Sequence, residues 1–243
     1  MRKMNVNVIC RRMVLWASLV AVCTLPGNTL LAKANPAAGK EVKYEKIKGN
    51  GQIEKEDREL PAFHDIQVMG TAKVIIEQGA ASSVTLTADA NLLPMLETVV
   101  KNGQLIVRTS PGKCLSFTQK PVVIIRTPDV DHIGMAGTGS ITNTAPLACN
   151  NLDITLSGTG NIDLTGKAAL LQARLSGTGN LSLHFDSKKL DVALAGTGDV
   201  RLMGKTGTAD LHVTGIGDID ATGLESEKIN SKTSGIGKVR TGK

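Results

Sequence analysis

The heptapeptide Met135-Ala-Gly-Thr-Gly-Ser-Ile141 decides the fold, because the chain repeats its pattern five more times. The copies are Leu156-Ser-Gly-Thr-Gly-Asn-Ile162, Leu175-Ser-Gly-Thr-Gly-Asn-Leu181, Leu194-Ala-Gly-Thr-Gly-Asp-Val200, Val213-Thr-Gly-Ile-Gly-Asp-Ile219 and Thr233-Ser-Gly-Ile-Gly-Lys-Val239. The first glycines of these copies follow one another at steps of 21, 19, 19, 19 and 20 residues. A period near twenty residues is typical of proteins built from stacked repeats.

Each repeat places a short alternating run of apolar and polar residues on either side of its glycines. Leu152, Ile154 and Leu156 precede one copy, and Ile162 and Leu164 follow it. Alternation with a period of two is typical of strands with one buried face. We therefore expect an all-β fold, a single-stranded right-handed parallel β-helix or β-solenoid with about 19–21 residues per coil.

An antiparallel β-sandwich is the alternative fold, because twenty residues also suffice for one hairpin. Hairpins favour two-residue turns such as Asn-Gly, whereas here a shared Gly-x-Gly joins two apolar strands. The near identity of the six motifs favours the solenoid.

The paired glycines are expected to form the corners of the coils. Glycine adopts backbone angles that other residues avoid and lets two chains approach closely, so a Gly-x-Gly between strands indicates a corner or a bulge. The predicted corner glycines are Gly137, Gly139, Gly158, Gly160, Gly177, Gly179, Gly196, Gly198, Gly215, Gly217, Gly235 and Gly237.

Residues 1–34 have the features of a signal peptide. They begin with basic residues and continue with an apolar run, residues 13–25, that is too short to span a bilayer. A small-x-small site predicts cleavage between Ala34 and Asn35. We therefore expect an exported protein of the periplasm or cell surface of a Gram-negative-type bacterium, with no membrane span in the mature chain.

The charge of the chain belongs largely to this signal. The whole chain has a formal net charge of +6, and residues 1–34 contain five Lys or Arg and no Asp or Glu, which leaves the mature chain near +1. Only 2% of the residues are aromatic. Neither a basic surface nor side chains for base stacking are therefore indicated, and we expect no nucleic-acid partner.

The remaining chain is expected to form a leader and one domain. Residues 35–60 are polar and charged, which predicts a flexible leader. Residues 61–243 are expected to form one β-solenoid domain, in which residues 61–133 supply the opening coils and a cap, continuous with the repeats. Met69-Gly-Thr-Ala-Lys-Val74 is a degenerate copy of the motif, and Leu92–Val100 is a candidate short helix.

Cleavage of the signal would leave two cysteines, Cys114 and Cys149. An oxidising compartment permits a disulfide between them. Two separate thiols are the alternative, because the sequence does not show whether the two side chains meet.

Several segments of the chain together resemble the head GIN domain family, which is described as a putative auto-transporter adhesin head in exported bacterial proteins. The segments are Phe63-His-Asp-Ile-Gln-Val68 with Gly70, Val74-Ile-Ile-Glu-Gln-Gly79, Asn91-Leu-Leu-Pro94 and Asn102-Gly-Gln-Leu-Ile-Val107, followed by the glycine corners. The resemblance covers about residues 61–240 and implies a GIN-type β-solenoid in a cell-envelope or surface setting. It implies little about biochemistry.

The carboxylates beside the corners are the strongest candidates for chemistry. Asp199, Asp218 and Asp220 follow glycines, but matching positions hold Ser, Asn and Lys, which disfavours a calcium-binding ladder. Asp199 and Asp218 would lie one coil apart, at the spacing of a retaining glycosidase pair. Asp163 and Asp220 would lie about 14 Å apart, which is too far.

Other polar residues give weaker signals. The histidines His64, His132, His184 and His212 occupy unlike positions in the repeat, so we expect no metal site. A strand rather than a helix follows each Gly-x-Gly, which disfavours nucleotide binding. The corner row Thr138, Thr159, Thr178 and Thr197 continues as Ile216 and Ile236, so we expect it to be semi-buried, with hydroxyls that bond the adjacent coil.

The sequence therefore predicts a non-catalytic exported β-solenoid protein of the cell envelope, with an adhesion, binding or structural role. We expect no catalytic, cofactor-binding or metal-binding residues, and a partner among envelope glycans or surface proteins. The alternative is a carbohydrate-active enzyme, a polysaccharide lyase or hydrolase built on a β-helix.

Overall fold

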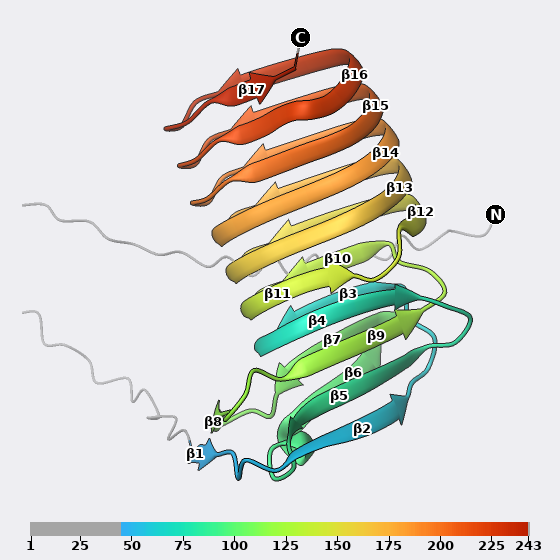
Figure 1. The fold of residues 1–243 in the computed structure, drawn as a ribbon, viewed down its shortest axis with the longest axis vertical. Helices are drawn as coiled ribbons and strands as arrows, with labels where there is room; N and C mark the ends of the chain where they lie inside the picture. Colours follow the sequence, from blue (N-terminus) through green and yellow to red (C-terminus); the bar gives the residue numbers. More distant parts are fainter. Residues whose placement is uncertain (1–44, 243) are drawn as a thin grey trace, which may run out of the picture. The chain divides into compact units, whose positions relative to one another are not determined.

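The computed structural model describes residues 45–242, most of which form strands (Figure 1). The strands of the opening part are β1 (Glu45–Lys48), β2 (Ile53–Glu59), β3 (Asp65–Met69), β4 (Thr71–Gln78), β5 (Ser83–Asp89), β6 (Leu96–Lys101), β7 (Gln104–Thr109), β8 (Lys113–Ser116) and β9 (Val122–Thr127). The strands of the repeats are β10 (His132–Met135), β11 (Thr138–Asn143), β12 (Leu147–Leu156), β13 (Thr159–Leu175), β14 (Thr178–Leu194), β15 (Val200–Val213), β16 (Ile219–Thr233) and β17 (Val239–Thr241).

The repeats stack as the coils of a parallel β-solenoid, which confirms the predicted fold class. Each long strand runs from one corner around a bend to the next corner, and it pairs in parallel with the equivalent strand of the next coil. Between β13 and β14 the register is 19 residues throughout, from Thr159 beside Thr178 to Leu175 beside Leu194. A sandwich of antiparallel hairpins is excluded for this region, because its neighbouring strands are parallel.

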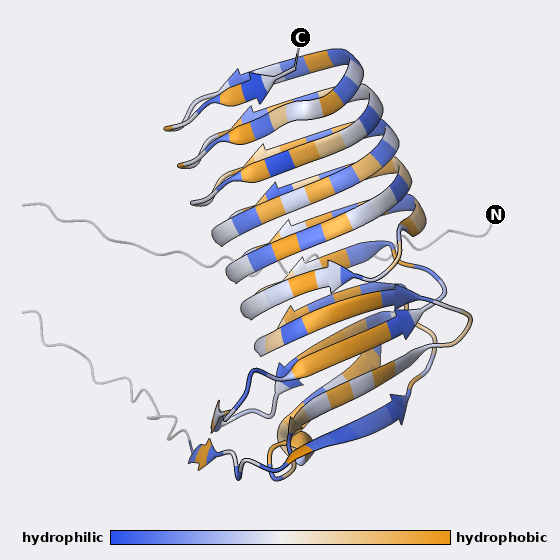
Figure 2. Ribbon diagram, in the orientation of Figure 1, coloured by the Kyte–Doolittle hydropathy of each residue, from blue (hydrophilic) through white to orange (hydrophobic). Residues whose placement is uncertain are grey.

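The inward positions of the coils form continuous apolar columns. Met135, Leu156, Leu175, Leu194 and Val213 occupy one column, and each is at most 1% exposed. Figure 2 shows the resulting alternation of apolar and polar bands along each strand. Burial of such side chains against the neighbouring coil supplies the main driving force for stacking.

The two glycines of each corner are needed for different reasons. A Cβ at Gly177 would overlap the carbonyl oxygen of Gly158 in the coil beneath. A Cβ at Gly179 would overlap the carbonyl oxygen of Gly160, and Gly179 also has a φ of +145°, which side chains rarely adopt. The first column therefore requires glycine because there is no room for a side chain. The second column requires glycine both for lack of room and for its backbone conformation.

The degenerate copy of the motif occupies the same column, as predicted. Thr71 pairs with Thr138 and Ala72 with Gly139. Ala72 is tolerated at the second glycine position because its φ is not positive, whereas Gly139 in the coil above has a φ of +153°.

The opening part forms the first coils and a cap, but not in chain order. β7 and β9 come later in the chain than β3 and β4, yet they pair with the lower edges of these strands, while β10 and β11 pair with the upper edges. Antiparallel strands then close the base, with β6 beside β7 and β5 between β9 and β2. The pairing therefore changes from parallel in the coils to antiparallel in the cap.

The prediction of a short helix over Leu92–Val100 is wrong. The segment forms a 3-10 turn, η1 (Leu93–Met95), followed by strand β6. Pro94 lies within this turn, and the β-branched Thr98 and Val99 pair with β7. Pairing with an apolar neighbour outweighs the local helical tendency of the segment.

The prediction of a flexible leader is wrong for residues 45–60. β1 pairs with β8, and β2 pairs with β5 over seven residues. The buried carboxylate of Asp89 holds the turn between β1 and β2, because it accepts the N–H of Gly51 at 2.9 Å. It also accepts the N–H and hydroxyl of Thr118, at 2.9 and 2.5 Å. Residues 35–44 lie outside the described residues.

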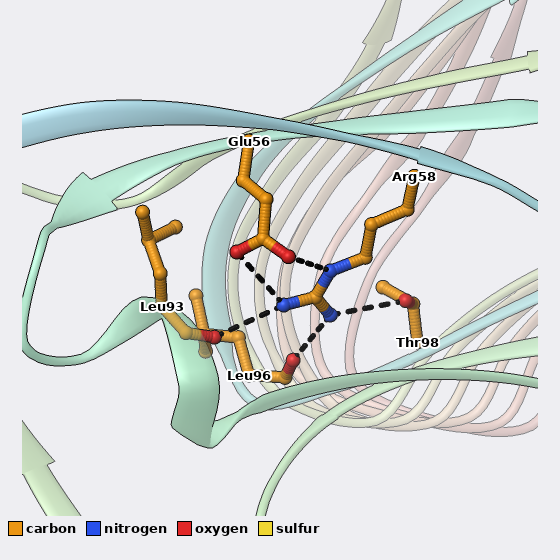
Figure 3. A network of polar contacts seen from close by, with 5 residues as sticks. All are labelled: Glu56, Arg58, Leu93, Leu96 and Thr98. Atoms are coloured by element: carbon orange, nitrogen blue, oxygen red, sulfur yellow. Dashed lines mark hydrogen bonds and ion pairs between the residues drawn. The ribbon is translucent and has the colours of Figure 1, made fainter.

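Arg58 joins the two sides of the base beneath the core (Figure 3). From β2, its guanidinium donates to the carbonyl oxygens of Leu93 and Leu96, at 3.1 and 2.6 Å, and to the Thr98 hydroxyl at 3.1 Å. Glu56 accepts two further hydrogen bonds and balances the charge. One side chain thus satisfies carbonyl groups at the end of the stack that have no coil below them.

No helix within residues 45–242 is long and apolar enough to cross a membrane. The expected signal peptide, with its cleavage site between Ala34 and Asn35, lies outside the described residues.

We predict that Gly177→Ala destabilises the fold by about 1–3 kcal/mol, because the added methyl group overlaps backbone of the neighbouring coil. Chemical denaturation measures the effect. Gly79→Ala is the control, since a Cβ there meets nothing within 4 Å. Equal stabilities of the two variants would contradict the role of the corner column.

We predict that Arg58→Ala lowers the free energy of unfolding by about 1.5–3 kcal/mol, because the Leu96 carbonyl loses its charged donor, while the Leu93 carbonyl keeps the Leu96 N–H. The control is Lys55→Ala on the same strand, whose side chain is 61% exposed and whose removal should change stability by less than about 0.5 kcal/mol. An Arg58→Ala variant as stable as the control would refute the capping role.

We predict that Asp89 makes the attachment of residues 45–52 sensitive to acid. The Thr118 hydroxyl, and then the N–H groups of Thr118 and Gly51, lower the pKa of Asp89. A lowered pKa means that the carboxylate stabilises the fold at neutral pH and that this contribution is lost as the pH falls through the lowered value. The gap in Tm between the wild type and Asp89→Asn should therefore be largest near neutral pH and shrink below pH 4. A gap that is constant with pH would contradict the assignment.

Candidate functional site

A groove of about 520 Å³ lies on the face formed by the strand segments that follow the corners. Its lining residues share two outward-facing positions in successive coils, together with the strand backbone between them. We call this the corner groove, and it is lined by Asn180, Leu181, Ser182, Asp199, Val200, Arg201, Asp218, Asp220 and Arg240.

The first side of the corner groove is a polar column that holds the coils in register. Each member accepts the backbone N–H of the next member: Asn161 Oδ1 from Asn180 at 3.2 Å, Asn180 Oδ1 from Asp199 at 3.1 Å, Asp199 Oδ1 from Asp218 at 2.9 Å, and Asp218 Oδ1 from Lys238 at 2.9 Å. Asn and Asp both present an oxygen at this point, which explains why they interchange along the column.

The second side of the corner groove is a column of changing charge. Asp163, Ser182, Arg201, Asp220 and Arg240 follow one another in this column. Arg240 donates to Asp218 Oδ2 at 2.9 Å, and Arg201 lies 4.0 Å from Asp220. The Thr222 hydroxyl and N–H donate to Asp220 and lower the pKa of its carboxyl group.

The candidate carboxylates are placed as the sequence predicted, but Asp199 and Asp218 already accept hydrogen bonds from other parts of the protein. Asp199 and Asp218 are neighbours in adjacent coils, and Asp163 and Asp220 are three coils apart with Ser182 and Arg201 between them. Asp199 binds the backbone of the next coil, and Asp218 binds both backbone and Arg240. Both oxygens of Asp218 are therefore engaged, whereas Asp199 keeps one oxygen available, so the pair lacks the second free carboxylate that glycoside hydrolysis needs.

The corner row is exposed, so the expectation of a semi-buried threonine ladder is wrong. Thr138, Thr159, Thr178 and Thr197 all point to solvent, and Ile216 and Ile236 are 53% and 74% exposed. The described residues show no hydrogen bond from these four hydroxyls to a neighbouring coil. The flanking glycines let adjacent corners approach closely, and the side chains between them lie outside the core.

The structure brings two of the four histidines together with aspartates. His64 Nδ1 lies 2.9 Å from Asp65 and 3.5 Å from Asp131, and His132 Nδ1 lies 3.5 Å from Asp153. Sequence reasoning missed this grouping, although alignment of the opening coil with the repeats places Asp65, His132 and Asp153 in one column. Residues 45–242 contain no group of three or more His, Cys, Asp or Glu arranged to hold a metal ion.

Both described cysteines are free thiols, and no disulfide joins them. Figure 1 shows β8, which carries Cys114, at the foot of the stack on the corner side, and the start of β12, which carries Cys149, on the opposite side. Burial, and then the charges of Asp131 and Asp129, raise the pKa of Cys149 to about 11. This thiol is therefore not a nucleophile at neutral pH.

The stacked coils define the chain as a β-solenoid, and comparison with known proteins places it in a family. The family model described as "Putative auto-transporter adhesin, head GIN domain" matches residues 62–184 and 170–242. These stretches span most of the chain, which therefore belongs to this family.

Solved structures of three bacterial proteins share the fold. A protein of Parabacteroides merdae titled a putative adhesin is 24% identical, with a TM-score of 0.75 over 81% of this chain and 83% of its own. A protein of Parabacteroides distasonis titled a putative lipid binding protein is also 24% identical, with a TM-score of 0.74 over 80% and 84%. A Bacteroides fragilis protein titled a putative adhesin is 20% identical, with a TM-score of 0.68 over 80% and 99%. No curated protein matches the chain.

We predict that Asp199→Ala destabilises the fold by about 0.5–1 kcal/mol, because the Asp218 N–H loses its acceptor. Asp199→Asn keeps an oxygen at this point and should be close to the wild type. Urea denaturation of both variants, with Asp191→Ala on the other face as the control, measures the difference. Equal stability of the Ala and Asn variants would show that the column does not hold the coils.

Proposed function

We propose that this protein is an exported, non-catalytic binding protein that acts in adhesion at the cell envelope. The observation that carries the proposal is the state of the carboxylates in the corner groove. Asp218 is held through both of its oxygens and Asp199 through one, so the pair presents acceptors that the fold fixes in place and does not offer two free carboxylates to a substrate.

The solenoid supports a binding role because its surface is rigid and repetitive. Outward side chains recur once per coil, at about 4.8 Å along the stack. A partner that is itself extended can therefore contact several coils at once, and weak contacts add together. The family description and the two related structures titled as adhesins support the same class of role.

Export is the part of the proposal that depends on residues 1–34. Expression in a Gram-negative host and N-terminal sequencing of the recovered protein should give Asn35 as the first residue. Retention of an intact Met1 in the cytoplasm would oppose an envelope role.

Binding and turnover are tested on the same preparation. We expect the secreted protein to bind envelope fractions or cells and to leave envelope and plant polysaccharides uncleaved. Release of reducing or unsaturated ends, abolished by Asp199→Ala, would instead establish the alternative, a carbohydrate-active enzyme. A protein that binds no envelope component would leave only a structural role and contradict the proposal.

A further inference from the structure

We propose that the corner groove binds a neutral oligosaccharide that lies along the stack. This inference rests on the proposed binding function and names its site and its class of ligand.

The coils leave several hydrogen-bonding groups of the groove without a protein partner among the described residues. Asp199 uses one carboxylate oxygen for the next coil and presents the other. Arg201 is 67% exposed, and its nearest acceptor, Asp220, is 4.0 Å away, beyond hydrogen-bond distance. Ser182 also lines the groove, one coil before Arg201 in the same column. Fixed acceptors and donors therefore stand side by side.

The charge of the groove favours an uncharged ligand. Asp199, Asp218 and Asp220 face two guanidinium groups, those of Arg201 and Arg240, which gives the lining a formal charge of −1. The carboxylates would repel a polyanion, and the two arginines would repel a polycation. A sugar hydroxyl both donates and accepts, so adjacent hydroxyls of one ring can bridge Asp199 and Arg201.

The length of the groove favours an oligomer over a single sugar. Its lining extends from Asn180 to Arg240, across four coils, which is about 14 Å at the spacing of parallel strands. The groove is open along the stack, so a chain of several sugar units can lie across successive coils. The groove has no aromatic side chain in its lining, so binding depends on many polar contacts, and a monosaccharide should bind weakly.

The repeat itself supplies the variant for the test. Asn180 and Ser182 occupy, one coil earlier, the positions of Asp199 and Arg201. The double variant Asp199→Asn with Arg201→Ser therefore gives this coil the residues of the preceding coil at both positions. It keeps the oxygen that accepts the Asp218 N–H. The matched control is Arg174→Thr with Asp191→Gln on the opposite face, which likewise copies the residues one coil earlier, Thr155 and Gln172.

The experiment titrates neutral oligosaccharides of one to six units, of several linkages, into the wild type and both double variants by calorimetry. We expect at least one linkage to bind the wild type, with affinity that rises with length. The groove variant should lose about tenfold or more in affinity, as expected for the loss of charged hydrogen bonds, and the control variant should not change.

Three other outcomes would overturn the inference. If oligosaccharides bind both double variants as they bind the wild type, the protein binds glycans elsewhere, and the proposed function survives without this site. If the groove variant loses binding to intact envelope fractions but no oligosaccharide binds the wild type, the site is right and the ligand class is wrong. If the wild type binds neither oligosaccharides nor envelope fractions, the proposed function fails as well.

Discussion

The structure depends on one close contact, in which the backbone of each coil occupies the space that a Cβ atom of the next coil would need. At the corners the Gly177 N–H donates to Leu156 at 3.0 Å, and the Thr178 N–H donates to Gly158 at 2.9 Å. These bonds keep successive corners at the spacing of paired strands. A side chain at Gly177 or Gly179 would push the corners apart while the strands on either side remained paired. The glycine columns are therefore the condition for stacking, and the apolar columns supply its free energy.

Because the register between coils is fixed, equivalent residues of successive coils lie above one another in a column. The composition of each column therefore decides whether it serves the core or the outer surface. Inward columns must stay apolar in each coil, and the outward Asn/Asp column must keep an oxygen for the next coil. Outward columns that make no bond to the backbone of the next coil can change from coil to coil. The column through Ser182, Arg201 and Asp220 changes in this way, and the corner groove forms beside it. The architecture therefore allows parts of the outer surface to vary from coil to coil while the core is kept.

The sequence predicted the repeats well because their determinants are local and periodic. Gly-x-Gly, the alternating apolar residues and the coil length all lie within twenty residues of one another. The cap was harder, because its contacts join distant segments. Arg58 reaches Leu93 and Leu96, and Asp89 reaches Gly51 and Thr118, without a sequence signal. Charged residues 53–59 appeared unstructured for the same reason, since their partner strand β5 lies thirty residues away. The corner groove was predicted in part. The sequence pointed to its aspartates, but it gave no sign that their carboxylates accept backbone N–H groups of the next coil.

Removal of one complete coil tests the central claim most directly. Deletion of residues 178–196 joins Gly177 to Thr197 and restores a Ser-Gly-Thr-Gly-Asp corner, so we expect a cooperatively folded protein that is shorter by about 4.8 Å along the stack. Deletion of residues 178–187 removes about half a coil and should abolish the register of all later coils. Circular dichroism, thermal unfolding and small-angle scattering distinguish these results. A one-coil deletion that unfolds, or a half-coil deletion that folds equally well, would contradict the account.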